Sequence, residues 1–318
     1  MRKALPVIVF LFLLFSCKKH NSTVSAGPGK WTALANFPGT GTAGTAGFSI
    51  GDYLFAGLGN GANSKTVKSF YKFDPGSGWN AIANFPFSVG ITASVGFSIG
   101  GLGYVVMTPD TLSNRGTLYA YDTTTNTWDA KSDYPGTMVQ GATAFVINGK
   151  AYVGLGTYAG VDYNEFYQYD PGTDKWTRLK DYPDAHPAWA ASFVIGGYAY
   201  VGTGGNGSEI ANCTANFYRY DPGTDTWIQK AGFPGGPRFL AAGFAIGNLG
   251  FISTGANALG QNVADCWQYD PGSDHWTRKA DFPGGTAEGA LGFSGSTVGY
   301  MLFDSGEPPT NNLWEFQP

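Results

Sequence analysis

The chain is poor in charged and metal-binding residues. Only 13% of its 318 residues are charged, and it contains three histidines and three cysteines. Structural and catalytic zinc sites need clusters of these two residue types, so we expect no zinc. A formal net charge of -4 offers no attraction for nucleic acid or for an anionic membrane surface. The sequence also lacks a G-x-S-x-G elbow in a strand-to-helix setting and a glycine-rich phosphate loop leading into a helix.

Long stretches of helical period are scarce as well. Glycine and proline are abundant instead, with 48 and 18 residues, and aromatic residues make up 16% of the chain. Short runs of β-branched and aromatic residues alternate with Gly, Pro, Asn and Asp turns, which is typical of an all-β protein. We therefore expect a single all-β domain.

The one long apolar run lies at the N-terminus. It covers residues 5–15, follows a short positive MRK segment, and is too short to predict a membrane span. The run ends in LFSC, which resembles a bacterial lipobox. The resemblance implies a signal peptide over residues 1–16 and a lipidated Cys17 with a polar tether over 17–29; the alternative is an ordinary signal peptide with an unrelated cysteine. Because Lys18 rather than an aspartate follows, we expect attachment to the outer membrane of the bacterial cell envelope, through the lipid alone.

An eighteen-residue phrase recurs along the chain. It reads FYQYDPGTDKWTRLKDYP at 166–183, FYRYDPGTDTWIQKAGFP at 217–234 and CWQYDPGSDHWTRKADFP at 266–283, with weaker copies at 70–86 and 118–135. The tryptophans that mark the series are Trp31, Trp79, Trp128, Trp176, Trp227 and Trp276, with successive differences of 48, 49, 48, 51 and 49 residues. A period near 50 is typical of kelch-type propeller blades.

Each repeat divides into four expected strands. After Pro135 these are GATAFVI, KAYVGLG, EFYQYD and KWTRL, joined by an Asn148-Gly149 turn, a loop and a DPGTD turn. The first strands are rich in small residues, which suits the innermost strand of a radial array, and we expect the repeated aromatic residues to form the core between blades. We expect the Asp pairs of DPGTD to cap turns, because they lack the further oxygen ligands of a calcium loop.

The chain resembles the kelch-repeat β-propellers, and in particular the lipoprotein-type relatives of the galactose oxidase central domain. The resemblance rests on the YDP-x-TD-x-W phrases, the FP or YP after each of them, and the strands YVGLG and YVGTGG. It covers residues 30–318 and implies a six-bladed all-β propeller. The last unit, 284–318, lacks its Trp strand, whereas the first Trp phrase, at 30–38, has no strands before it. We therefore predict that the N-terminal strand completes the last blade and closes the ring.

The galactose oxidase resemblance raises the question of copper. That site needs two His ligands, a Tyr and a Tyr–Cys crosslink, whereas this chain has only His20 in the tether, His186, and His275 on the face opposite His186. We therefore expect no copper and no other cofactor. Cys213 and Cys266 belong to neighbouring repeats, and the sequence leaves open whether they form a disulfide or two separate thiols.

The candidate site lies on the face that carries the blade connections and the loops between second and third strands. The connections contribute Gln140, His186, Trp189, Arg238 and Glu288, and the loops contribute Arg115, Tyr158, Asp162, Glu165, Asn206, Glu209, Asn257, Gln261, Asp265 and Glu307. Because they precede innermost strands, we expect Gln140, Trp189, Arg238 and Glu288 to rim the axial opening and bind a sugar, with Tyr158 and Glu165 as further contacts. The alternative is that Trp189 plugs the channel and Arg238 pairs with a carboxylate.

Three functions fit these features. The leading prediction is a monomeric, non-catalytic binding module that takes a glycan or an envelope protein through its loops. The second is a metal-free sugar epimerase or mutarotase similar to the periplasmic N-acetylneuraminate epimerases, with Glu288, Arg238 and His186 as candidate acid and base. The third is a structural or assembly scaffold without a small ligand.

Overall fold

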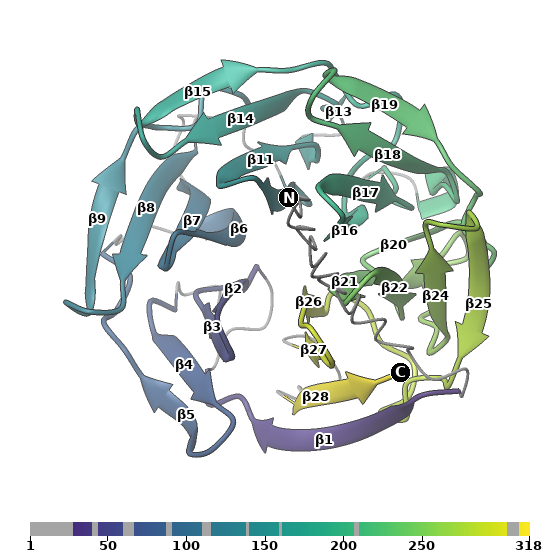
Figure 1. Ribbon diagram of the computed structural model, residues 1–318, viewed down its shortest axis with the longest axis horizontal. Helices are drawn as coiled ribbons and strands as arrows, with labels where there is room; N and C mark the ends of the chain where they lie inside the picture. The colour runs from purple at the N-terminus through teal and green to yellow at the C-terminus, as the bar shows by residue number, and fades with distance from the viewer. Residues whose placement is uncertain are drawn as a thin grey trace, which may run out of the picture.

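Six four-stranded antiparallel sheets form a closed ring in the computed structural model, which confirms the predicted six-bladed β-propeller (Figure 1). The structure describes residues 28–39, 44–59, 67–86, 91–109, 116–137, 140–158, 161–206, 210–303 and 312–318. The predicted signal peptide, Cys17 and nearly all of the tether lie outside the described residues, as do Arg115, Glu209 and Glu307. None of the described residues belongs to a helix that is long and apolar enough to cross a bilayer.

Each blade runs from an innermost to an outermost strand. Blade 1 contains β2 (Ala46–Ile50), β3 (Tyr53–Gly57), β4 (Phe70–Asp74) and β5 (Gly78–Ala81). Blade 2 contains β6 (Ile91–Ile99), β7 (Leu102–Pro109), β8 (Thr117–Asp122) and β9 (Thr127–Lys131). Blade 3 contains β10 (Thr143–Ile147), β11 (Lys150–Gly154), β14 (Phe166–Asp170) and β15 (Lys175–Arg178).

The other three blades follow the same order. Blade 4 contains β16 (Ala191–Ile195), β17 (Tyr198–Gly202), β18 (Phe217–Asp221) and β19 (Thr226–Gln229). Blade 5 contains β21 (Ala242–Ile246), β22 (Leu249–Ser253), β24 (Cys266–Asp270) and β25 (His275–Lys279). Blade 6 contains β26 (Leu291–Phe293), β27 (Gly299–Leu302), β28 (Asn312–Gln317) and β1 (Lys30–Asn36). Two small sheets pair β12 (Thr157–Tyr158) with β13 (Val161–Asp162), and β20 (Arg238–Phe239) with β23 (Ala256–Asn257). A short 3-10 helix, η2, covers Ile210–Asn212.

Blade 6 joins the two ends of the described chain. Strand β1 pairs antiparallel with β28, with Trp31 opposite Phe316. The indole nitrogen of Trp31 also donates a hydrogen bond of 3.0 Å to the carbonyl of Ala280, which lies 249 positions away at the end of blade 5. The predicted closure by an N-terminal strand is confirmed, and it covers what would otherwise be an open sheet edge.

The innermost strands approach one another closely around the axis. A Cβ atom on Gly96 would lie 2.4 Å from the carbonyl oxygen of Gly47, and one on Gly292 would lie 2.2 Å from that of Gly243. No side chain fits at these contacts between neighbouring blades, which explains the small residues in the first strand of each repeat. The space left on the axis is a cavity of about 330 Å³, lined by the innermost strands of all six blades.

The repeated phrase holds neighbouring blades together. Each of its tryptophans donates an indole hydrogen bond to a backbone carbonyl at the end of the preceding blade: Trp31 to Ala280, Trp79 to Ala35, Trp128 to Ala83, Trp176 to Ser132, Trp227 to Lys180 and Trp276 to Ala231. The rings pack on the aromatic residues of the neighbouring phrase; Trp176, for example, lies edge-on against Tyr134. The expected place of these aromatic residues in the core between blades is confirmed.

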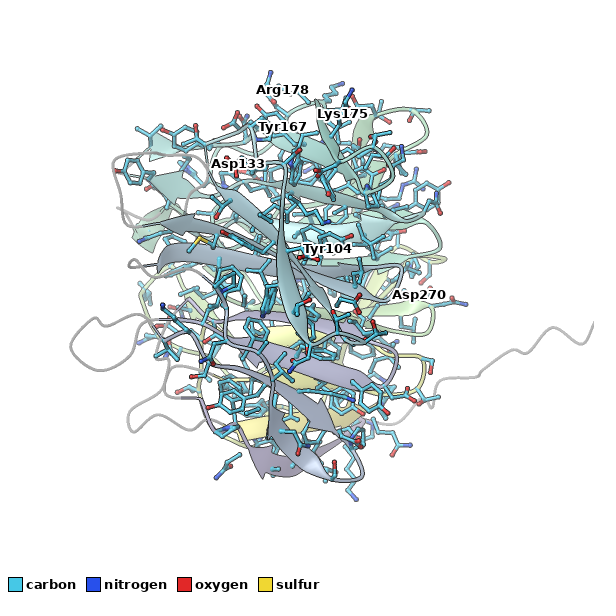
Figure 2. All side chains as sticks on the ribbon, turned by 90° about the vertical axis from the view of Figure 1, so that its left-hand side faces the viewer. Tyr104, Asp133, Tyr167, Lys175, Arg178 and Asp270 are labelled. Atoms are coloured by element: carbon cyan, nitrogen blue, oxygen red, sulfur yellow. The ribbon has the colours of Figure 1, made fainter. Side chains whose placement is uncertain are left out.

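The two acidic residues of each DPGTD turn have different roles. The first caps its own turn, as Asp170 does by accepting a hydrogen bond of 2.9 Å from the amide of Gly172. The equivalent Asp270 of blade 5 is visible from the side of the ring in Figure 2. The second reaches the preceding blade: Asp174 accepts hydrogen bonds from the amide of Ser132 and the hydroxyl of Tyr169. Nowhere in the described ranges do three or more His, Cys, Asp or Glu side chains gather in a way that could hold a metal ion.

We expect acid to destabilise the ring through these inter-blade carboxylates. Burial alone would raise the pKa of Asp174, but the hydrogen bonds from Ser132 and Tyr169 outweigh it and lower the pKa; at Asp274, bonds from Tyr269, Ala231 and Lys230 likewise outweigh burial. A carboxyl whose pKa is lower in the folded than in the unfolded state stabilises the fold above the unfolded value of about 3.9, and this contribution is lost as the pH falls through the folded pKa.

The urea concentration at the midpoint of unfolding, measured at pH values from about 7 to about 2, should therefore decrease once the pH is below about 4. The double variant Asp174→Asn, Asp274→Asn should be less stable at neutral pH and should lose less stability in acid. An unchanged acid dependence in the double variant would contradict this role of the two carboxylates.

Candidate functional site

Backbone pairing gathers the blade connections and the second-to-third-strand loops on one face. We call this the loop face; its described parts include the connections 132–137, 140–142, 179–190, 230–241 and 280–290 and the loops 155–158, 161–165, 203–206, 210–216 and 254–265. Gln140 exchanges two backbone hydrogen bonds with Thr157, and Ala188 exchanges two with Gly205. In blade 5, β20 pairs with β23 in the same manner. The expected arrangement of this face is confirmed.

Four equivalent residues form a chain of backbone hydrogen bonds where the connections enter the innermost strands. The amide of Trp189 donates to the carbonyl of Gly141 at 2.9 Å, that of Leu240 to Trp189 at 3.2 Å, and that of Gly289 to Leu240 at 2.9 Å. All four backbones are left-handed, with φ angles of 73° at Gly141, 55° at Trp189, 56° at Leu240 and 74° at Gly289. We call these four residues the mouth ring. Gly44, two positions before β2, has a similar φ of 77°.

Trp189 is the bulkiest member of the mouth ring. A left-handed backbone is unfavourable for a large side chain, at a cost on the order of 1–3 kcal/mol, and such residues concentrate at ligand sites. The half-buried indole lies 6.1 Å from the ring of Phe239, centroid to centroid. It also lies over Gly141, where an added Cβ would come within 2.8 Å of two indole atoms. Trp189 is not among the described residues that line the axial cavity, so it takes no part in the wall of that cavity, and its role as a plug at the entrance stays a prediction.

Arg238 does not lie on the rim where the sequence pattern placed it. Its side chain is 1% exposed, and its guanidinium donates to both carboxylate oxygens of Asp265 at 2.6 and 3.0 Å. It also donates to the carbonyls of Thr254 and Gly235. Burial alone would raise the pKa of Asp265, but Arg238 outweighs it and the pKa is lowered. The alternative interpretation, in which Arg238 pairs with a carboxylate, agrees with the structure. A direct contact between Arg238 and a ligand stays a prediction.

Arg238 is buried because it lies one position earlier in its connection than Glu288 does in the next one. The Arg238 carbonyl accepts from the amide of Gly204, as the Ala287 carbonyl accepts from that of Gly255. Arg238 is therefore equivalent to Ala287, and Phe239 is equivalent to Glu288. Successive side chains of an extended segment point to opposite sides, so Arg238 faces away from the side that Phe239 occupies.

Two largely buried carboxylates hold His186, one through its side chain and one through its backbone. Its Nδ1 atom is 2.9 Å from Oδ2 of Asp162, whose side chain is 10% exposed, against 36% for His186. The other oxygen of Asp162 is buried without a hydrogen-bond partner among the described residues. Asp184, 8% exposed, accepts from the amide of His186, the hydroxyl of Thr214 and the side-chain amide of Asn216. The segment from Asp184 to Trp189 is thus fixed at both ends, which holds His186 in a defined orientation.

The remaining predicted site residues divide into exposed and structurally occupied ones. Gln140 is exposed next to Gly141, and Tyr158 is 48% exposed on the β12–β13 hairpin. Glu288, directly before Gly289, is half-buried, and this burial raises its pKa. Glu165 accepts from the amide of Thr137 and the hydroxyl of Tyr167, so it braces its own loop. The structure therefore brings Gln140, Trp189 and Glu288 to the mouth ring and leaves Glu165 in a bracing role.

Both described cysteines are free thiols. Cys266 is fully buried in β24, and burial raises its pKa to about 12. Burial also raises the pKa of Cys213. Of the two possibilities that the sequence left open, the structure contains the separate thiols.

Sequence reasoning missed Phe239 and Asp184, and it did not pair His186 with Asp162. Phe239 could have been found by aligning the connections on the repeat period, because it occupies the position of Ala188 and Glu288. No sequence pattern predicts the pairing of His186 with Asp162, because the two residues come from different repeats and the residues around them do not recur.

Comparison with known proteins supports the fold. No known protein family matches the sequence, and no curated protein does. One solved structure, described as the structure of YjhT, is similar with a TM-score of 0.73, covering 89% of this chain and 95% of that chain. The sequence identity is 16%, so this similarity concerns the fold alone.

Proposed function

We propose that the protein is a non-catalytic module that binds a glycan at the mouth ring. The observation that carries the proposal is the left-handed backbone of Trp189, which keeps an indole partly exposed beside Phe239. Such a surface suits the apolar face of a sugar ring, and the amide of Gln140 and the carboxyl of Glu288 are planar groups for its hydroxyls. All four members of the mouth ring share this backbone, but only here does it carry an indole, which supports a role for the indole beyond packing.

The proposal includes a place at the cell envelope. A lipid on Cys17 would attach the protein, as a monomer, to the outer membrane, and the loop face would present the site. The exposed Tyr158 and Val161 of the β12–β13 hairpin favour an additional contact with an envelope protein on the same face.

Thermal stability in the presence of sugars tests glycan binding. A ligand at 100 times its dissociation constant stabilises the fold by about 2.7 kcal/mol, which moves the melting temperature visibly. We expect a neutral or acidic sugar from a panel that includes galactose and N-acetylneuraminate to raise the melting temperature of the protein without its predicted signal peptide. Trp189→Ala should abolish this shift. A shift that persists in Trp189→Ala, or no shift with any sugar, would contradict a glycan site at the mouth ring.

Two glycine variants provide a matched control for the position of the indole. Gly141→Ala and Gly44→Ala introduce the same backbone strain, because both residues have a left-handed φ. Only at Gly141 does the new methyl group collide with Trp189, whereas at Gly44 no described residue lies within 4 Å of it. Gly141→Ala should therefore weaken sugar binding and Gly44→Ala should not.

A metal-free sugar epimerase or mutarotase is the second candidate. It is favoured by Glu288, whose raised pKa keeps it available as an acid to higher pH, and by the imidazole of His186 as a base. The buried guanidinium of Arg238 does not suit the same role. The rate of exchange between the anomers of N-acetylneuraminate, measured by proton NMR, decides between binding and catalysis. If the protein accelerates this exchange and Glu288→Gln does not, catalysis would be established.

A further inference from the structure

We infer that the mouth site takes uncharged saccharides and excludes acidic ones, because two largely buried carboxylates hold His186 on the same loop face, three residues before Trp189. The inference rests on the proposed glycan site and specifies its substrate class. The carboxylate of Asp162 contacts the imidazole of His186, and that of Asp184 accepts a hydrogen bond from the backbone amide of the same residue.

The charge around His186 is negative and lacks a cation to offset it. In the described parts of the chain neither Asp162 nor Asp184 has a lysine or arginine within the 4.0 Å of an ion pair; Asp184 is held by neutral donors only. The guanidinium of Arg238 is already neutralised by Asp265 and its side chain is 2% exposed, so a ligand anion does not reach it. An acidic sugar would therefore bring its charge toward two like charges in a region of low dielectric, where repulsion is strong.

The hydrogen-bonding groups favour the same class of ligand. A carboxylate only accepts hydrogen bonds, so the contact with Asp162 places the proton of neutral His186 on Nδ1 and leaves a lone pair on Nε2. No described residue bonds to Nε2, and the side chain is 36% exposed on the loop face. This nitrogen can accept a hydrogen bond from a sugar hydroxyl, whereas an ionised carboxyl group has no hydrogen to donate. Asp162 is in this sense a positioning residue for His186.

One carboxylate oxygen of Asp162 is buried and has no hydrogen-bond partner among the described residues. A buried carboxylate oxygen without a hydrogen bond is costly, so a site normally supplies a donor for it. This oxygen is shielded from solvent, so a donor of the right kind is small and neutral, such as a water molecule that a sugar hydroxyl orders. An anionic ligand would increase the cost instead.

Matched pairs of sugars test the inference. The probes are the methyl glycosides of glucose, galactose and mannose, each compared with the uronic acid that differs only at C6, in saturation-transfer NMR titrations of the protein at neutral pH and low salt. We expect each neutral sugar that binds to do so at least about tenfold more tightly than its acid. In Asp162→Asn the ratio should shrink. The ratio is measured within one variant, so a change in that variant's stability does not imitate the result.

Two histidine variants test the acceptor role. His186→Asn retains a donor for Asp162 but lacks Nε2, and it should weaken binding of the neutral sugar; His275→Asn, in the outer turn of blade 5, should not. Nitrogen-15 NMR should show the Nδ1–H tautomer of His186 in the wild type and its loss in Asp162→Asn.

The outcomes separate the inference from the function on which it rests. If acidic sugars bind as tightly as neutral ones and both are lost in Trp189→Ala, the glycan site stands and the exclusion of acidic sugars is overturned. If no sugar of either class binds, both are overturned. A neutral preference that Asp162→Asn leaves unchanged would also overturn the role of the two carboxylates.

Discussion

Replacing Arg238 with methionine is expected to lower the free energy of unfolding by about 3–5 kcal/mol. The substitution leaves Asp265, whose side chain is 15% exposed, without its bidentate partner. It also removes the donors to the carbonyls of Thr254 and Gly235. Urea unfolding at neutral pH, followed by tryptophan fluorescence, measures the change.

An exposed ion pair is the matched control. Arg178 pairs with Asp181, but their side chains are 55% and 43% exposed, so Arg178→Met should cost no more than about 1 kcal/mol. The double variant Arg238→Met, Asp265→Leu should recover much of the loss, because no charge is then left buried alone. Should Arg238→Met be as mild as Arg178→Met, the guanidinium would not be a structural element, and its predicted contact with a ligand would gain weight.

Removing the tryptophan of the closing strand is expected to be about as damaging. Trp31→Ala should lower the free energy of unfolding by about 3–5 kcal/mol, because a 9%-exposed indole leaves a cavity. The ring packs against Phe316 at 4.6 Å and Phe282 at 5.4 Å between centroids, and it holds Ala280 of blade 5. Urea unfolding gives the total, and amide hydrogen exchange shows where the structure opens.

Trp276 serves as the comparison for Trp31. It is 6% exposed and donates a hydrogen bond of the same 3.0 Å length to the preceding blade. Its strand β25, however, is joined directly to its partner β24 by the turn at 271–274, whereas β1 and its partner β28 are far apart in the sequence and no turn joins them. Trp276→Ala should cost a similar free energy, but only Trp31→Ala should accelerate exchange throughout β1 and β28. Equal exchange patterns would contradict the idea that β1 is the weak closure of the ring.

Features that repeat were predictable from the sequence. The fifty-residue period indicated the blade, and the incomplete units at the two ends indicated that β1 completes blade 6. The small residues of the first strands predicted the innermost position, because Gly47 and Gly96 meet where no side chain fits. In each case the same physical requirement applies in several blades, so several copies of the pattern support one conclusion.

The site was predictable only in part, because it consists of contacts that occur once. The rim positions of Gln140, Trp189 and Glu288 follow from the connections before the innermost strands, but a shift of one residue turned Arg238 to the interior. The partner of His186 comes from the hairpin of the preceding blade. The left-handed φ of Trp189 depends on a backbone bond to Gly141. Sequence patterns do not encode such pairings between non-repeating loops.

The pairing of β1 with β28 also determines when the molecule can finish folding. Strand β1 leaves the ribosome first among the described strands, but the strand that it pairs with leaves last. Until then the edge of β1 has no native partner strand, while blades 1 to 5 can already assemble from contacts between neighbours. The final step therefore closes a loop of almost the whole chain, and it delays the sealing of the ring until synthesis has reached the last strand.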